Sequence, residues 1–233
     1  MLFRSNNQQL KKGKMKIKDF AVERYFAKYE FTAKYLLSSS DCDGYSMEYV
    51  LNLASNEDKN RWNSLKLGYT ETRGSEELRT AIAQHFQTIG TKDVVVSSPG
   101  EANFSLMNVL LKRGDHVVCM APMYQSMYQI AKNMGCRLSF WQPDFKPDWY
   151  YDPAQLAQLI TPKTKLVVVN FPHNPTGYSP NLADWEAIIA IVRKHGVTLF
   201  SDEMYRFLNY KPEDDIPSAC DMYDNDYFVR FFE

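Results

Sequence analysis

Two short segments contain the residues whose types and spacing could do chemistry. The first runs from Asn170 to Gly177 and has two prolines within four residues, so it can continue neither a strand nor a helix. Its N-P-T-G part makes a rigid turn in which Gly177 can adopt a positive φ angle, and this turn aims the Asn174 amide at a fixed point. The second segment, S-D-E-M-Y at 201–205, places the acid Asp202 where an apolar run ends.

Both segments follow predicted strands of one α/β sheet. Short apolar or β-branched runs alternate with helical patterns from Ser75 onward. The predicted strands are Val94–Val96, His116–Met120, Arg137–Trp141, Lys165–Asn170 and Val197–Ser201. The predicted helices cover residues 75–87, 102–112, 124–134, 152–160 and 181–195. This alternation is typical of a mainly parallel sheet with helices on both faces, whose ligands bind at the carboxyl ends of the strands.

The residues before Ser75 follow a less regular pattern. They predict helices over residues 17–37 and 46–54 and a polar loop over residues 56–68. The predicted domains are a disordered basic tail at 1–16, an N-terminal helical segment at 17–55 and a main domain at 56–233.

The spacing of the glycines argues against several common phosphate-binding and hydrolytic motifs. No two glycines are closer than six residues, so the G-x-G-x-x-G pattern of dinucleotide-binding folds is absent. No glycine precedes Lys-Ser or Lys-Thr, and no G-x-S-x-G nucleophile elbow occurs. A nucleotide-binding α/β domain is therefore disfavoured. His85, His116 and His195 show no metal-ligand or triad spacing, so we expect them to be structural.

Composition and charge narrow the class of function further. The 233 residues carry a net charge of −1, whereas proteins that bind nucleic acid or anionic membranes need a basic excess. No apolar stretch approaches 18 residues, and the N-terminus has no apolar signal core, so we expect neither a membrane span nor secretion. The four cysteines are far apart, which favours a reducing, cytoplasmic setting without a disulfide framework or a zinc site.

The two chemical segments together resemble the class I/II aminotransferases, the fold-type I enzymes that use pyridoxal phosphate. N-x-P-H-N-P-T-G at 170–177 and S-D-E-x-Y at 201–205 match this family in residue type and spacing. The resemblance covers about residues 45 to 210. It implies the large, pyridoxal-phosphate-binding domain of that fold, in incomplete form.

Further segments match the same family in the right order. Residues 67–83, which include Leu67-Gly68-Tyr69 and Gly74-Ser75-Glu76-Glu77-Leu78-Arg79, resemble its Y-x-x-x-x-G-x-x-x-L-R-x-A-I-A segment. Residues 114–118 and 122–124 resemble its G-D-x-V and P-x-Y segments. S-S-S-D at 38–41, taken with P-H-N-P-T-G, also resembles the capreomycidine synthase-like branch, which leaves the substrate unassigned.

The resemblance implies roles for the polar residues of the two segments. Asp202 is similar to the acid under the pyridine nitrogen of the cofactor, which keeps that nitrogen protonated and makes the ring a better electron sink. The alternative for Asp202 is a capping Asp after a strand. Asn174 and Tyr205 are similar to the pair that hydrogen-bonds the phenolic oxygen of the cofactor, and a turn Asn with a core Tyr is the alternative. His173 lies inside the same motif, but the residue type at this position varies in the family, so we expect it to be structural.

Three further contacts with the cofactor are implied by the same resemblance. Tyr124 is similar to the aromatic residue that stacks on the pyridine ring, with a core aromatic as the alternative. The backbone N–H groups of Gly100, Glu101 and Ala102 would hold the phosphate, although the family prefers a small or hydroxyl residue where Glu101 stands, and an ordinary capped helix is the alternative. Tyr69 is similar to the tyrosine that crosses a dimer interface to the partner's phosphate, which implies a homodimer; a solvent-facing loop Tyr is the alternative.

The lysine that forms a Schiff base with the cofactor in this family has no match. The family places it after the D-E-x-Y strand, in an S-x-S-K segment. The single lysine after Asp202 is Lys211, in a charged loop without flanking serines, so we assign no catalytic residue. We therefore expect a C-terminally truncated chain that lacks the small domain, leaves the aromatic segment at 226–233 without a partner strand and exposes part of its core.

Two functions are compatible with these observations. The intact protein would be an aminotransferase-like enzyme acting on an amino acid and a keto acid, by transamination or by related chemistry at the α-carbon. The alternative is a non-catalytic remnant that still binds the cofactor, or one subunit of a split enzyme.

Overall fold

The computed structural model describes residues 18–40, 42, 44–146, 148–224 and 226–229. The chain divides into two compact units. Met1–Ala27 and Ser98–Glu233 form the first, called here the sheet unit, and Lys28–Ser97 form the second, called the helical unit. These boundaries differ from the predicted one between residues 55 and 56, and the predicted basic tail at 1–16 lies outside the described residues.

A parallel sheet of five strands, in the order β2-β1-β3-β4-β5, forms the centre of the sheet unit. The strands are β1 (His116–Met120), β2 (Arg137–Trp141), β3 (Thr164–Asn170), β4 (Thr198–Asp202) and β5 (Asp226–Val229). The first four agree with predicted strands to within one residue at each end. The chain forms β2 on one side of β1 and β3 on the other, so the strand order reverses between β1 and β3. Sheets of this kind bind ligands at such a reversal.

The prediction of a fifth strand at Val94–Val96 is wrong. Val94–Val96 is not a strand, because its backbone does not run beside another strand: the Val96 N–H donates to the Arg73 carbonyl, 2.9 Å away, in the loop before α4. The fifth strand of the sheet is β5, which pairs in parallel with β4. The expectation that the aromatic segment at this end lacks a partner strand is therefore wrong for residues 226–229, and residues 230–233 lie outside the described part of the chain.

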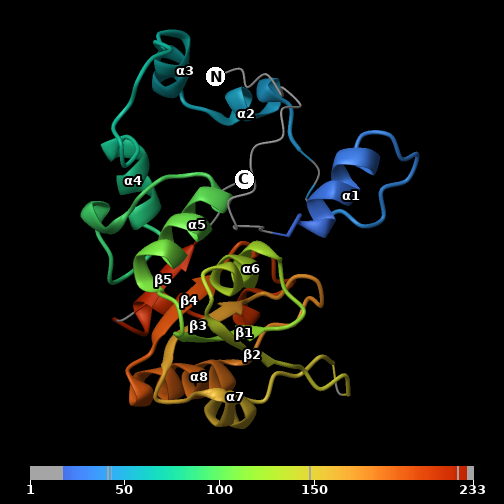
Figure 1. Ribbon diagram of the computed structural model, residues 1–233. Coiled ribbons are helices and arrows are strands. Elements are labelled where there is room, and N and C mark those ends of the chain that lie inside the picture. Colours follow the sequence, from blue (N-terminus) through green and yellow to red (C-terminus); the bar gives the residue numbers. More distant parts are fainter. Residues whose placement is uncertain (1–17, 41, 43, 147, 225, 230–233) are drawn as a thin grey trace, which may run out of the picture. The chain divides into compact units, whose positions relative to one another are not determined.

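Side chains of successive strand residues point to opposite faces of the sheet, as the period of two requires. Four helices cover these faces, namely α5 (Pro99–Leu110), α6 (Ser126–Asn133), α7 (Pro153–Leu159) and α8 (Leu182–His195). Val118 and Val167 lie in a buried cluster with α7 and α8, whereas Val117 and Val168 lie in one with α5 and α6. Figure 1 shows the two helix pairs on opposite sides of the sheet, which confirms the predicted architecture.

Local sequence signals fix the ends of α7 and α8. Asp152 caps α7 by accepting a hydrogen bond from the Ala154 N–H at 2.8 Å, and proline occupies the first helical position. Asn181 caps α8 by accepting from the Asp184 N–H at 2.9 Å. Gly196 ends α8 in the left-handed conformation, with φ of 60°. These signals set the points at which the chain enters and leaves β3 and β4.

The helical unit contains α2 (Met47–Leu53), α3 (Asn56–Asn63), α4 (Glu76–Ala83) and the short 3₁₀ helix η1 (Thr91–Asp93). The predicted loop at 56–68 is wrong for α3. Ser55 begins this helix by accepting a hydrogen bond from the Asp58 N–H at 3.1 Å, and the acids Glu57 and Asp58 occupy its first turn. Because α3 is polar, it lacks the apolar periodicity that identifies an amphipathic helix.

The helix predicted over residues 17–37 is shorter in the structure. It is α1 (Ala21–Tyr29), and it ends where the Thr32 hydroxyl donates to the Lys28 carbonyl at 2.9 Å. Two further 3₁₀ helices, η2 (Pro212–Asp214) and η3 (Ala219–Asp221), lie between β4 and β5. Within the described ranges, no helix combines the length and apolarity that crossing a membrane requires.

Candidate functional site

The carboxyl ends of β3 and β4 bring the two chemical segments together. Asn170 and Asp202 are paired residues at the ends of these strands, and the Asn170 amide donates to the Asp202 carbonyl at 3.0 Å. The Asn170 side-chain oxygen accepts from the Asn174 N–H at 2.8 Å, which orients the turn. The Asn174 Nδ2 then donates to the Tyr205 hydroxyl at 3.1 Å. The predicted pair of Asn174 and Tyr205 is therefore in direct contact, and Asn170 links it to Asp202.

Asp202 is buried at the end of β4. Its Oδ1 accepts a hydrogen bond from the Met204 N–H at 3.1 Å. Within the part of the chain that the structure describes, no group donates to its Oδ2. Burial is the largest cause that raises the pKa of Asp202, the hydrogen bond from Met204 lowers it and the charge of Glu203 raises it, and together they bring the pKa to about 7. A buried carboxyl group with one oxygen open to a further donor has the chemistry to pair with a cationic N–H group.

Glu203 is a buried acid that carries no role predicted from the sequence. Its Oε2 accepts from the Ser218 hydroxyl at 2.7 Å and its Oε1 from the Ala219 N–H at 2.8 Å. Arg206 lies 3.4 Å from Oε2 as an ion pair, and the Ser201 hydroxyl lies 3.2 Å from Oε1. These bonds attach the segment before β5 to the end of β4. The sequence signal that could have identified Glu203 is an acid at the end of a predicted buried strand, because a buried acid must be paired.

Tyr124 lies in the loop after β1, beside the reversal in strand order. Its hydroxyl donates to the Glu23 carboxylate of α1, and its ring contacts the edge of the Phe20 ring at a centroid distance of 6.5 Å. The next residue, Gln125, accepts from the Ala21 N–H and donates to the Asp19 carbonyl, both at 3.0 Å. Burial and the bond to Glu23 raise the pKa of Tyr124. Residues 19–23 thus lie against this loop, a contact that no pattern along the sequence indicates.

The start of α5 differs from the prediction. The helix begins at Pro99, three residues before the predicted start, because proline at the first helical position loses no hydrogen bond. The Ala102 N–H donates to the Ser98 carbonyl at 2.9 Å, so this amide belongs to the helix ladder. In the described part of the chain no group accepts from the N–H groups of Gly100 and Glu101. Of the three amides predicted to hold a phosphate, these two remain suited to it.

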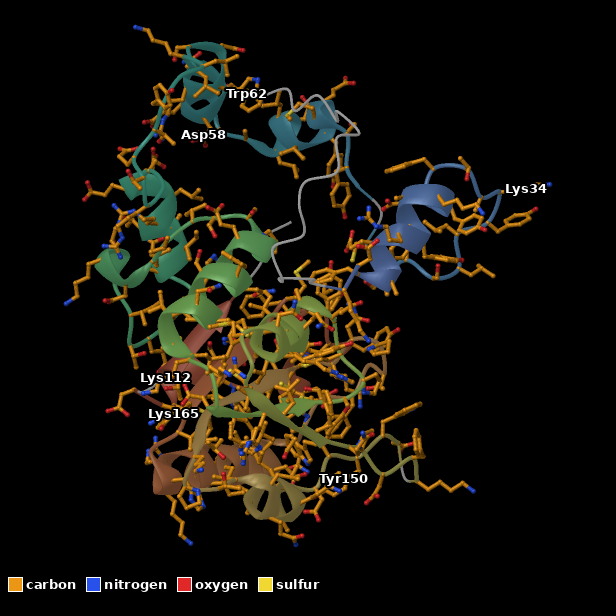
Figure 2. All side chains as sticks on the ribbon, viewed as in Figure 1. Lys34, Asp58, Trp62, Lys112, Tyr150 and Lys165 are labelled. Carbon is orange, nitrogen blue, oxygen red and sulfur yellow. The ribbon has the colours of Figure 1, made fainter. Side chains whose placement is uncertain are left out.

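Tyr69 belongs to the helical unit, and its side chain is fully exposed. Its role at a partner's phosphate stays a prediction. The lysines at the amino-terminal ends of the strands do not approach the site. Lys165 is the second residue of β3 and Lys112 precedes β1, and Figure 2 shows both at the outer edge of the sheet unit. Lys211 lies exposed in the loop after β4.

Comparison with known proteins identifies the family. The model of the family described as aminotransferase class I and II matches residues 32–229. The chain belongs to this family. Because the match includes both chemical segments and the whole described sheet, the resemblance seen in the sequence is confirmed. Aminotransferases of class I and II use pyridoxal phosphate as their cofactor.

The chain aligns with only part of the length of curated aminotransferases. The chain is 31% identical to methionine aminotransferase of Escherichia coli K12 over 155 residues, which cover 62% of this chain and 39% of that protein. It is 30% identical to arginine–pyruvate transaminase of Pseudomonas aeruginosa over 157 residues, or 65% of this chain and 40% of that protein. The chain therefore aligns with about two fifths of the length of these relatives.

Solved structures of aminotransferases share the fold. A PLP-dependent aminotransferase from Streptococcus suis superposes with a TM-score of 0.82 and 28% identity, covering 93% of this chain and 58% of that one. Aspartate aminotransferase from Thermus thermophilus with maleate gives a TM-score of 0.72 and 26% identity, covering 82% of this chain and 50% of that one. The fold is thus that of the fold-type I aminotransferases.

Proposed function

We propose that this chain binds pyridoxal phosphate at the carboxyl ends of β3 and β4 and supplies the cofactor site of an enzyme that converts an amino acid and a keto acid. The observation that carries the proposal is the convergence of Asp202, Asn174 and Tyr205 at two paired strand ends. The strand-order reversal beside them supports it, since α/β sheets bind ligands there.

Asp202 would hold a proton on the ring nitrogen of the cofactor. When bound, pyridoxal phosphate supplies an electron sink for charge that develops at the α-carbon of an amino acid. Without a cation, burial shifts the carboxyl group of Asp202 toward its neutral form and raises its pKa to about 7. A protonated nitrogen near Oδ2 would reverse this preference, because opposite charges in a buried site stabilise each other. Asp202 would thereby keep the ring nitrogen of the bound cofactor protonated.

Asn174 and Tyr205 would bind the phenolic oxygen of the cofactor. A carboxamide carries two N–H donors and a phenol carries one O–H donor, so the pair has the donors that an anionic oxygen requires. The bond from Asn174 to Asn170 holds the turn in place before any ligand binds. The N–H groups of Gly100 and Glu101, at the start of a 12-residue helix, would hold the phosphate. Tyr124 would lie against the ring face.

We further propose that the protein acts as a homodimer in the cytoplasm. The helical unit, taken by itself, exposes large apolar side chains of the kind that mark an interaction surface. They include Phe31, Leu37, Tyr45, Leu53, Leu67 and Tyr69. Figure 2 shows Trp62 on α3, and this side chain is 47% exposed as well. The cytoplasmic setting is supported by four widely spaced cysteines, each of which is a free thiol in the structure.

The alternative function is that of a cofactor-binding chain without catalysis, or of one subunit of a split enzyme. This alternative stays a prediction. Lys211, the one lysine after Asp202 in these 233 residues, lacks the flanking serines of the family's S-x-S-K segment. The capreomycidine synthase-like branch remains a prediction, and so does the choice between transamination and other α-carbon chemistry.

Titration with pyridoxal 5′-phosphate tests the proposal. The purified chain, its Asp202→Ala variant and the exposed-site control Asp144→Ala are titrated by the quenching of tryptophan fluorescence. We expect saturable binding to the parent chain and the control, and weakened binding to Asp202→Ala. Absence of saturable binding to the parent chain would reject the proposal.

Borohydride reduction separates the two functions. After reduction of the saturated complex, mass spectrometry of peptides locates any lysine that carries the cofactor. A stoichiometric adduct on one lysine, lost in Asp202→Ala, supports an enzyme complete in this chain. Binding without such an adduct supports a site that holds the cofactor non-covalently.

A further inference from the structure

His173 is a buried residue inside the N-P-T-G turn segment, and the proposed cofactor contacts do not use it. Its Nδ1 lies 2.7 Å from the Thr176 hydroxyl, within its own turn. Its Nε2 lies 2.7 Å from the Pro122 carbonyl, in the loop after β1. Because that loop carries Tyr124 and the turn carries Asn174, the imidazole joins two loops on opposite sides of the strand-order reversal.

The contacts of His173 fix its tautomer. A carbonyl oxygen accepts hydrogen bonds and cannot donate, so at 2.7 Å the Nε2 must carry the proton that points to Pro122. The Nδ1 is then the acceptor, and the Thr176 hydroxyl donates to it. The Thr176 oxygen also accepts from the Tyr178 N–H at 3.2 Å, which is consistent with that direction. Burial lowers the pKa of His173, so the neutral ring is favoured, although the Pro122 bond opposes this shift.

A second buried group supports the same connection. Tyr151 is fully buried, and its hydroxyl donates to the Ala121 carbonyl at 3.1 Å. The same hydroxyl lies 3.4 Å from the His173 Nε2, and the two rings meet edge to face at a centroid distance of 5.2 Å. Two adjacent carbonyls of the loop after β1 are thus held by two buried side chains. Rigid attachment of this kind limits how far the loop can move from the turn.

We propose that His173 is a positioning residue: as the neutral Nε2–H tautomer, it ties the Tyr124 loop to the Asn174 turn and sets the gap in which the cofactor ring is held. The inference rests on the proposed function for its consequence in cofactor binding. The bridge itself is a property of this chain in the absence of any ligand. It gives a role to the one histidine of the turn segment, which the sequence predicted to be structural only.

Two substitutions of His173 distinguish its hydrogen bond to Thr176 from its hydrogen bond to Pro122. In His173→Asn the side-chain amide lies near the former Nδ1 position, so it keeps a partner for Thr176 and loses the bond to Pro122. In His173→Gln the terminal N–H reaches the former Nε2 position and keeps the bond to Pro122. His195→Asn makes the same chemical change at an exposed histidine and serves as the control. Circular dichroism and urea unfolding establish that each variant is folded.

Two measurements are made on the chain without cofactor. Nitrogen-15 NMR of the His173 ring at pH 7.5 should show a neutral imidazole protonated at Nε2. Hydrogen exchange followed by mass spectrometry should show faster exchange in peptides over residues 121–128 for His173→Asn, and exchange like that of the parent chain for His173→Gln. A ring protonated at Nδ1, or equal exchange in the two variants, would overturn the proposal.

Binding of pyridoxal 5′-phosphate gives the functional readout. Loss of one buried hydrogen bond that positions the ring corresponds to an affinity about tenfold lower for His173→Asn, whereas His173→Gln should stay within about threefold of the parent chain. Equal affinities of the two variants would overturn the positioning role. If the parent chain does not bind the cofactor, the proposed function fails, while the NMR and exchange results still decide whether the bridge exists.

Discussion

Replacing Asp202 by asparagine should remove a pH dependence of stability that the buried carboxyl creates. The asparagine oxygen can still accept the bond from the Met204 N–H, so the substitution removes ionisation and leaves the local geometry intact. The pKa of Asp202 is raised from 3.8 to about 7 in the folded chain. A tenfold change in proton affinity corresponds to about 1.4 kcal/mol, so the full effect on the free energy of unfolding is about 4 kcal/mol.

The direction follows from which state binds the proton more tightly. Because the folded pKa of Asp202 lies above the unfolded value, the native state holds the proton more tightly, and stability falls as the pH rises from about 4 to about 7. Between pH 5 and pH 8 this single group should lower the free energy of unfolding by about 3 kcal/mol. The asparagine variant lacks this loss.

Urea unfolding at pH 5, 6, 7 and 8 measures the effect. The quantity of interest is the change in unfolding free energy from pH 5 to pH 8 in the parent chain minus the same change in Asp202→Asn. Asp144→Asn, at an exposed site, controls for the loss of one negative charge. If Asp202→Asn follows the parent chain to within about 0.5 kcal/mol across this range, the burial argument for Asp202 is wrong.

Two further substitutions test the framework around the site. Glu203→Ala leaves Arg206, Ser218 and the Ala219 N–H without their buried acceptor, so urea unfolding should show a loss of about 3 kcal/mol or more; a loss below about 1 kcal/mol would contradict the anchoring role. Gly196→Ala places a side chain at φ of 60° with no neighbouring atom within 4 Å of the new Cβ, so the loss should be conformational only, about 1 kcal/mol in thermal unfolding, and an unchanged midpoint would contradict it.

Much of the sheet unit could be predicted from the sequence because its signals are local. The strands β1 and β3 contain the apolar runs 117–120 and 166–169, of the kind that buried parallel strands require. Asp152, Asn181 and Gly196 mark helix ends by their own chemistry. The prediction failed where strand formation depends on pairing with a distant segment. The β-branched run Val94–Val96 has strand composition without a strand partner, and composition carries no information about pairing.

In the candidate site too, the contacts indicated by local sequence segments were predicted and the other contacts were not. The pairing of Asn174 with Tyr205 and the position of Asp202 follow from two segments at neighbouring strand ends, so spacing in the sequence was sufficient. The contacts made by Glu203 and His173 join segments far apart in the chain, and no pattern along the sequence indicates them. The position of Glu203 at the end of a predicted buried strand indicated that it must be paired, but the partners of both side chains become visible only in the fold.

Direct observation of the ring nitrogen tests the central claim, that Asp202 holds the cofactor in its cationic form. Pyridoxal phosphate labelled with nitrogen-15 in the ring is bound at pH 8 to the parent chain and to Asp202→Asn, and the nitrogen chemical shift is recorded for each complex. A protonated nitrogen in the parent chain and an unprotonated one in Asp202→Asn is the result that the buried carboxyl predicts. An unprotonated nitrogen in the parent chain, or the same chemical shift in both complexes, would contradict it.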